Sequence, residues 1–128
     1  LGLGNGRTFH HMREIMPDRD IFVFERAVAS NPDSTPADDK LILGDVYDTL
    51  PAALSRFGAI AGLVHADLGG HNLEKNDAFA KAISPLVEPL LTMGGVMVSS
   101  DKMYFENLHE IALPKEAVPG RCFIYRRQ

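Results

Sequence analysis

The sequence predicts an α/β fold, a three-layer sandwich in which helices cover both faces of a mostly parallel sheet. Short apolar runs at residues 21–25, 40–43 and 59–66 alternate with longer stretches of helical periodicity. The runs lack the alternation of a half-exposed strand, as expected for parallel strands that helices cover on both faces. The length of 128 residues suits one domain, and we expect residues 1–128 to form it.

Residues 1–8 join an apolar strand end to three alternating glycines, Gly2, Gly4 and Gly6, and then to a helical pattern. Glycines permit the dihedrals of a sharp strand-to-helix turn and let a bound molecule approach the backbone amides. The stretch therefore indicates a nucleotide-cofactor loop. Because the chain opens on Leu1 and a strand usually needs several more residues, we expect the first strand to be missing from the front of this sequence.

A short helix is expected after the loop, with Thr8 as its cap and Pro17 as its end. Its apolar residues fall on one stripe, which consists of Phe9, Met12, Ile15 and Met16. The apolar run 21–25 predicts the next strand. Residues 29–40 are rich in Ser, Asn, Asp and Pro and predict a loop.

Residues 40–43 predict a short strand that ends at Gly44. The stretch 48–51 is a strong helix start, because a capping hydroxyl is followed by an early proline. Gly58 is placed to end this helix.

The run 59–66 is the most continuously apolar, so we expect it at the centre of the sheet. Asn72 is expected to open a long amphipathic helix. Pro85 and Pro89 should kink or break that helix.

Gly94 and Gly95 are expected to stop the long helix, and residues 95–99 to form the next strand. Residues 108–113 and 121–127 are also strand-like. The connection between these two is too short for a crossover helix, so they should pair antiparallel as a hairpin.

The composition narrows the class of protein. Hydrophobic residues make up 45% and charged residues 23%, which is ordinary for a globular protein. No apolar run has the length of a membrane span and no secretory signal pattern is present, so we expect a cytoplasmic protein without a membrane partner. The net charge of −4 gives no general attraction to nucleic acid. Cys122 is the single cysteine, which excludes an internal disulfide and a cysteine cluster for zinc.

Glu25 closes the second strand about 20 residues after the glycines, the spacing at which a doubly wound sheet holds a ribose. A carboxylate only accepts hydrogen bonds, so Glu25 suits a pair of ribose hydroxyls. The alternative is a surface glutamate at the end of an ordinary strand.

Four features together resemble the class I S-adenosylmethionine-dependent methyltransferases, and small bacterial members most of all. They are G-L-G-N-G at residues 2–6, Val23-Phe24-Glu25, Leu43-Gly44-Asp45-Val46 and the closing hairpin. The resemblance implies a Rossmann-like sheet of seven strands in the order 3-2-1-4-5-7-6, with the last hairpin antiparallel and the first strand truncated here. It also implies methyl transfer from S-adenosyl-L-methionine, with S-adenosylhomocysteine as product, to a small-molecule acceptor.

The resemblance assigns cofactor contacts residue by residue. The glycine loop would lie beneath the methionine portion, Glu25 would bind the ribose, and Asp45 would accept from the adenine amino group. Val46 would supply a backbone amide and an apolar wall for the ring, and Ala66 with Asp67 would lie beside the transferring methyl group. The full expected set is Gly2, Gly4, Asn5, Gly6, Arg7, Thr8, Glu25, Arg26, Gly44, Asp45, Val46, Ala66 and Asp67.

The stretch 65–71 holds the most reactive side chains at the carboxyl end of a strand, where ligands of open parallel sheets bind. Asp67 or His71 is the candidate to deprotonate an acceptor. His65 lies within the strand, where a hydrogen-bonded core histidine is the commoner role.

The sequence also offers a candidate metal site. Asp67 and Asp101 follow the fourth and fifth strands, which resembles the acidic ligands of magnesium-dependent O-methyltransferases. Lys102 stands where that group has an asparagine, and a third ligand is missing. We therefore expect no metal.

Two alternatives remain open from the sequence. The first is a nicotinamide-dependent oxidoreductase on a similar sheet, and the second is a non-catalytic member that only binds the cofactor. The D/N-P-P-Y/F stretch of enzymes that methylate base amines does not follow the fourth strand, which reads His65-Ala66-Asp67-Leu68-Gly69. No nucleic-acid substrate is expected, and assembly into a homo-oligomer is left open.

Overall fold

The computed structural model describes residues 1–128, which form two compact units, residues 1–49 and 50–128. Each unit is described by itself. The helices and strands are α1 (Arg7–Ile15), β1 (Val23–Glu25), β2 (Leu41–Leu43), α2 (Val46–Phe57), β3 (Ala61–Ala66), α3 (Leu73–Val87), β4 (Leu91–Ser99), β5 (Leu108–Glu110) and β6 (Phe123–Arg127). Short 3-10 helices occur at η1 (Pro32–Ser34), η2 (Asp38–Lys40) and η3 (Glu88–Leu90). This alternation confirms the predicted α/β class.

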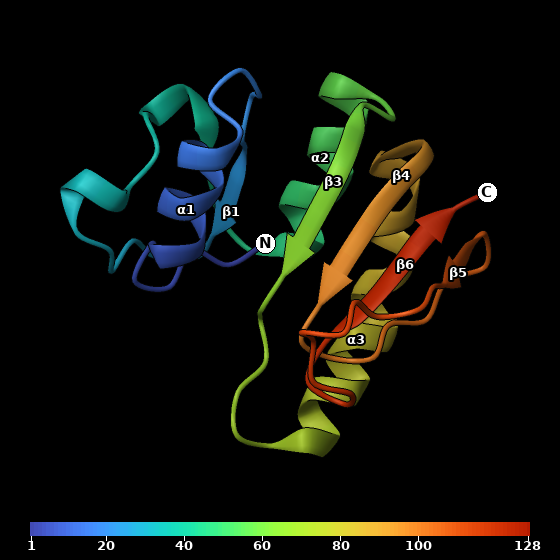
Figure 1. Ribbon diagram of the computed structural model, residues 1–128. Coiled ribbons are helices and arrows are strands. Elements are labelled where there is room, and N and C mark those ends of the chain that lie inside the picture. The colour runs from blue at the N-terminus through green and yellow to red at the C-terminus, as the bar shows by residue number, and fades with distance from the viewer. The chain divides into compact units, whose positions relative to one another are not determined.

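In the first unit, β1 and β2 pair in parallel, with Glu25 opposite Leu43 at their carboxyl ends. Helix α1 lies beside β1 (Figure 1). Phe9 from the helix packs with Leu3 and Val23 in a buried cluster. The pairing matters for the site because it brings two strand ends, and the turns that follow them, to one edge.

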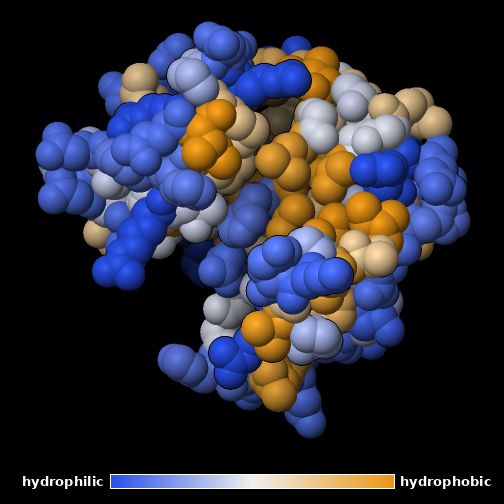
Figure 2. Space-filling model, viewed as in Figure 1, coloured by the Kyte–Doolittle hydropathy of each residue, from blue (hydrophilic) through white to orange (hydrophobic).

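In the second unit, the strands have the order β3-β4-β6-β5. The β3–β4 pair is parallel, whereas β6 is antiparallel to both β4 and β5. Figure 1 shows α3 behind this sheet, and its residues Ile83 and Val87 are buried, as is Met97 of β4. The opposite face, turned toward the viewer in Figure 2, carries apolar side chains at its surface, and Leu63 of β3 is 41% exposed.

The seven-stranded single sheet is wrong for this chain, which has six strands in two sheets. Residues 1–3 form no strand, although Gly2 N donates to Phe24 O at 2.8 Å. One such bond fixes the position of the segment but does not make a ladder. The expected neighbours are otherwise found, because the two sheets correspond to strands 3-2 and 4-5-7-6 of the predicted order, and the closing hairpin is confirmed.

Two expected helix starts are wrong. Helix α1 has Gly6 as its N-cap, with no side-chain cap, so Thr8 lies inside the helix. Helix α2 begins at Val46, and Pro51 lies inside it. The reason is that Asp45 caps this helix: its Oδ1 accepts from Tyr47 N at 3.0 Å, which satisfies an amide of the first turn. Of the expected α1 stripe, only Phe9 is buried.

The third strand of this chain, β3, lies at an edge of its sheet, so the expected central position is wrong. Gly94 and Gly95 lie within β4 and do not end the long helix as expected. Leu90 ends η3, so the chain has left the helical region before either glycine. A register shift in the β3–β4 pairing falls opposite these glycines, and Gly94 has a φ of 76°, a conformation that glycine adopts at little cost.

Other expected boundaries are confirmed. Asn72 caps α3 by accepting from Lys75 N at 3.0 Å. The helix ends at Val87, between the two prolines, and Pro89 lies in η3. Gly58 has a φ of 71° and its amide donates to Leu54 O at 2.9 Å, so it ends α2. None of the helices is both long and apolar enough to cross a membrane.

Candidate functional site

The glycine loop of the first unit is a tight turn that leads into α1. Gly6 N donates to Leu3 O at 2.9 Å, and Gly2, Gly4 and Gly6 have φ values of 81°, 54° and 84°. These dihedrals lie in the left-handed region, which residues other than glycine adopt only at an energetic cost. The alternating glycines thus have the conformational role that the sequence predicted.

Two of the three glycines differ in what surrounds them. A Cβ on Gly6 would overlap the carbonyl oxygen of Ser34 and lie 2.7 Å from the Ser34 Cβ, so α1 can start only with a glycine at this point. A Cβ on Gly4 would meet no atom within 4 Å. The loop therefore packs against η1 on one side and leaves open space beside Gly4 on the other.

Glu25 joins this loop to the end of β1. Its Oε2 accepts from Leu3 N at 2.8 Å and from Gly4 N at 3.2 Å, and its Oε1 accepts from Arg26 N at 2.7 Å. Burial raises the pKa of the Glu25 carboxyl, but backbone hydrogen bonds from residues 3, 26, 4 and 27 outweigh that effect and hold the pKa below its ordinary value. The group is consequently a carboxylate at neutral pH.

The turn after β2 lies next to Glu25. Gly44 N donates to Glu25 O at 3.0 Å, and Gly44 has a φ of 139°. Asp45 is exposed and uses Oδ1 as the cap of α2, whereas Val46 is only 7% exposed. The first unit thus brings together the glycine loop, Glu25 and residues 44–46, as the sequence predicted.

The remaining predicted residues of this unit are at its surface. Arg7, Thr8 and Arg26 are exposed. Asn5 accepts from Arg7 N at 3.1 Å through Oδ1, which covers one amide at the start of α1. The arginine side chains remain available to a bound anion.

In the second unit, the carboxyl ends of β3 and β4 are joined through Ser100. Its amide donates to Ala66 O at 3.2 Å, and its hydroxyl lies 3.0 Å from Asp67 Oδ1 and 3.4 Å from Asp101 Oδ2. A hydroxyl has one proton, and the shorter contact is the one to Asp67. Ala66 is buried, whereas Asp67 and His71 are exposed.

Asn76 of α3 holds the loop that follows β3. Its Oδ1 accepts from Gly70 N at 2.9 Å, and its Nδ2 donates to Gly70 O at 2.9 Å. Sequence reasoning missed Asn76 and Ser100. The sequence holds one signal for Asn76: a polar side chain near the start of a helix can hydrogen-bond the loop that precedes the helix.

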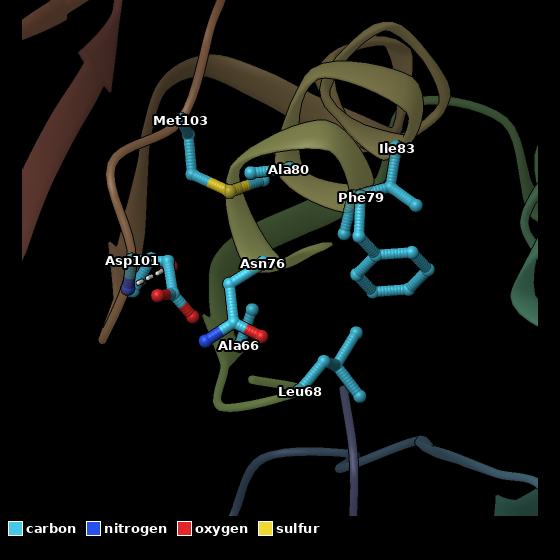
Figure 3. Close-up of a pocket in the computed structure, with 9 residues that line it drawn as sticks. Ala66, Leu68, Asn76, Phe79, Ala80, Ile83, Asp101 and Met103 are labelled. Atoms are coloured by element: carbon cyan, nitrogen blue, oxygen red, sulfur yellow. Dashed lines mark hydrogen bonds between the residues drawn. The ribbon is translucent and has the colours of Figure 1, made fainter. Parts of the chain in front are cut away.

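A pocket lies where β3 and β4 end, against α3 (Figure 3). It is a shallow hollow whose enclosed volume is about 10 Å³, close to the space of one water molecule. The lining residues come from β3 and its loop, from α3, and from β4 and the segment after it: Ala66, Leu68, Asn76, Phe79, Ala80, Ile83, Ser99, Asp101 and Met103. Most of them are apolar, and Asp101 is the one that carries a charge.

No group of three or more His, Cys, Asp or Glu side chains is arranged to hold a metal ion. Asp67 and Asp101 both approach the Ser100 hydroxyl. His65 is half-buried, and burial lowers its pKa.

Residues 1–127 match a protein family described as S-adenosyl-L-methionine methyltransferase. The chain is also similar to the crystal structure of an S-adenosyl-L-methionine methyltransferase from Silicibacter pomeroyi DSS-3, with 69% sequence identity and a TM-score of 0.97. That similarity covers 99% of this chain and 78% of the other. No curated protein matches this sequence.

Proposed function

The chain belongs to the S-adenosyl-L-methionine methyltransferase family, and from that premise we propose that its methyl acceptor is a small molecule. Family membership decides for S-adenosylmethionine over a nicotinamide cofactor. When bound, S-adenosylmethionine supplies a methyl group on a positively charged sulfonium, which leaves as a neutral thioether. The match over residues 1–127 is the observation on which this function rests.

Glu25 is proposed to bind the ribose of the cofactor. Backbone amides of residues 3, 4 and 26 already donate to this carboxylate, so a ribose hydroxyl would share one of its oxygens with these amides. Its low pKa keeps it an acceptor at neutral pH. The open space beside Gly4 supports an approach of the cofactor to this edge. The negative charge of Glu25 suits the positive charge of the cofactor's sulfonium.

Asp45 is proposed to accept from the adenine amino group through Oδ2, because Oδ1 caps α2. The Val46 side chain is buried, so we assign its backbone amide, and not its side chain, to the ring. Arg7 is the candidate for the cofactor carboxylate, since guanidinium and carboxylate form charge-assisted hydrogen bonds. Asn5, Thr8, Arg26 and Gly44 complete the proposed contacts of the first unit.

Asp67 and His71 are proposed as candidates for a general base. Methyl transfer needs a base only where the acceptor must lose a proton, and the rest of the work is positioning and exclusion of water. The Ser100 hydroxyl orients Asp67 at the end of β3. We also propose that Ala66 and Asp67 lie beside the transferring methyl group. This assignment is carried over from the family pattern.

The small-molecule acceptor is proposed from the position of the candidate base at the end of β3, because ligands of open parallel sheets bind beyond the carboxyl ends of the strands. The hollow there is shallow and mostly apolar, with a few polar groups. A macromolecular acceptor would need a wide complementary surface.

A crystal structure with S-adenosylhomocysteine tests the assigned contacts. We expect a ribose hydroxyl within hydrogen-bond distance of Glu25 and the adenine amino group within hydrogen-bond distance of Asp45. A ribose bound away from Glu25 would contradict the assignment. A turnover assay on a broad panel of metabolites, read as release of S-adenosylhomocysteine, tests the acceptor class.

A further inference from the structure

The loop after β3 is held to α3 by one side chain. Asn76 Oδ1 accepts from Gly70 N at 2.9 Å, and Asn76 Nδ2 donates to Gly70 O at 2.9 Å. Figure 3 shows the Asn76 side chain pointing from α3 toward this loop, between Leu68 and Asp101. The amide of Asn76 therefore bonds both backbone groups of one loop residue. We call these two hydrogen bonds the Asn76 clamp.

The start of the same loop is held by Ser100. Its amide donates to Ala66 O at 3.2 Å, and its hydroxyl donates to Asp67 Oδ1 at 3.0 Å. The loop 67–71 is thus held at its start by Ser100 and near its end by the Asn76 clamp.

Gly69 lets the backbone of the loop lie against the Asn76 amide. A Cβ on Gly69 would be 2.9 Å from Asn76 Nδ2 and 2.5 Å from Asp101 Oδ2, which is closer than Cβ atoms approach their neighbours. Both of these atoms lie at the end of a side chain. A larger residue at position 69 would therefore displace the Asn76 amide from Gly70.

The burial of the core does not require the Asn76 clamp. Residues 67 and 69–71 are exposed, and their backbone groups can bond water instead. What the hydrogen bonds add is order in an exposed segment, whose conformational freedom is otherwise costly to remove. That segment carries the two candidate bases, Asp67 and His71, beyond the carboxyl end of β3, where ligands of open parallel sheets bind.

We propose that Asn76 is a positioning residue for methyl transfer: through Gly70 it fixes the loop 67–71, so that a candidate base meets the acceptor in one geometry. Reacting groups gain rate from proximity and orientation only while they are held in place. The inference rests on the proposed function, because Asp67 and His71 are proposed bases. Loss of the clamp should lower the rate and spare cofactor binding, since most of the proposed cofactor contacts lie in residues 1–49.

The variant Asn76→Ala removes both hydrogen bonds of the clamp and keeps a residue that favours a helix. Its exposed neighbour on α3 supplies the matched control, Lys75→Ala. Hydrogen exchange of the Gly70 amide in the full chain reports on the clamp. We expect Asn76→Ala to lower the protection of this amide about ten-fold, since its hydrogen bond to Asn76 is lost, and Lys75→Ala to retain it. Unchanged protection in Asn76→Ala would overturn the proposal.

Turnover and cofactor binding are measured on the same variants. The rate is read as S-adenosylhomocysteine released from saturating S-adenosylmethionine with one batch of the low-molecular-mass fraction of cell extract, and calorimetry gives the Kd of S-adenosylhomocysteine. We expect Asn76→Ala to lower the rate about ten-fold or more and to keep the Kd within about two-fold, and Lys75→Ala to keep both. A full rate without protection, or a Kd that rises in step with the loss of rate, would refute the positioning role.

The variant Gly69→Ala tests the same clamp without changing Asn76. Its Cβ should push the Asn76 amide away, so we expect this variant to lose protection at Gly70 and to lose turnover, as Asn76→Ala does. The control for the exchange measurement is Gly70→Ala, whose Cβ would meet no atom within 4 Å and which should keep the protection of its own amide. A full rate in Gly69→Ala would contradict the role of the loop.

The wild type separates this inference from the proposed function. If it releases S-adenosylhomocysteine only with the macromolecular fraction of the extract, the small acceptor is wrong, and the same variants compared on that fraction decide the role of Asn76. If it binds S-adenosylhomocysteine but turns over neither fraction, the inference is overturned as stated.

Discussion

Glu25 holds the glycine loop, and we propose a second role for it at the cofactor. It accepts from two amides of the glycine loop and from the amide after β1, and it is the proposed ligand of the ribose. A loop with three left-handed glycines is costly to order, and hydrogen bonds from a carboxylate offset part of that cost. Cofactor affinity should therefore depend on Glu25 both through direct contact and through loop order.

Replacing Glu25 tests this dependence. We expect Glu25→Ala to weaken binding of S-adenosylhomocysteine by about 1 to 3 kcal/mol, measured by calorimetry, because charge-assisted hydrogen bonds are lost. Glu25→Gln should lie between the wild type and the alanine variant. The exposed Glu14→Gln is the control. Unchanged affinity in Glu25→Ala would remove the residue from the ribose role.

Replacing Gly6 should lower the stability of the fold. Its φ is 84°, and a side-chain carbon at this position would overlap the Ser34 carbonyl oxygen, so Gly6→Ala must both strain and displace backbone. We expect a loss of at least about 1 to 2 kcal/mol in the free energy of unfolding, measured by urea denaturation. Gly70→Ala meets no atom within 4 Å and should change stability by less than about 0.5 kcal/mol. A loss as small in Gly6→Ala as in Gly70→Ala would contradict the argument.

At the scale of elements, local signals predicted some boundaries and missed others. Asn72 and Gly58 were predictable because each acts on residues next to it in sequence. The start of α2 was not predictable in this way, because the sequence offers both Asp45 and the later Asp48 and Thr49 as possible caps. In the structure Asp45 is the cap, since it accepts a hydrogen bond from Tyr47 N.

Contacts between distant segments were beyond the sequence. Ser100 joins the ends of two strands and Asn76 holds a loop six residues before it, and neither follows from spacing or composition. The glycine loop, Glu25 and residues 44–46 were predictable because they share a motif with fixed spacings. The pocket was not predictable, because its lining comes from three segments that are separated in the sequence.

Glu88 ties η3 to the segment before β5. Its carboxylate accepts from Glu106 N at 2.9 Å and from both Asn107 N and Asn107 Nδ2, at 2.9 and 2.6 Å. Burial raises the pKa of Glu88, but these hydrogen bonds, with the charge of Arg127, outweigh that effect and hold its pKa below the ordinary 4.5. The hairpin is thus anchored by an ionised group.

This anchor predicts how stability depends on pH. Because the folded pKa of Glu88 is lowered, its contribution is complete above the unfolded value of about 4.5 and is lost as pH falls through the folded pKa. We expect Glu88→Gln to be less stable than the wild type at neutral pH and the difference to shrink in acid, measured by urea denaturation across pH. The exposed Glu116→Gln is the control. A difference that stays constant with pH would contradict the role of the charge.

At the scale of the whole molecule, helix α2 crosses from residue 49 to residue 50, the boundary between the two units. Most of the proposed cofactor contacts lie in residues 1–49. Ala66, Asp67 and His71 lie in residues 50–128. We propose that both serve one methyltransferase domain, as predicted from the length of the chain, and the shared helix supports it.

Methyl transfer to a small acceptor is tested most directly with fractionated cell extract. The protein is incubated with S-adenosylmethionine labelled in its methyl group, and with extract separated into a low-molecular-mass fraction and a macromolecular fraction. We predict that S-adenosylhomocysteine accumulates, and the label moves, only with the low-molecular-mass fraction. Transfer of the label to protein or nucleic acid alone would contradict the proposed function.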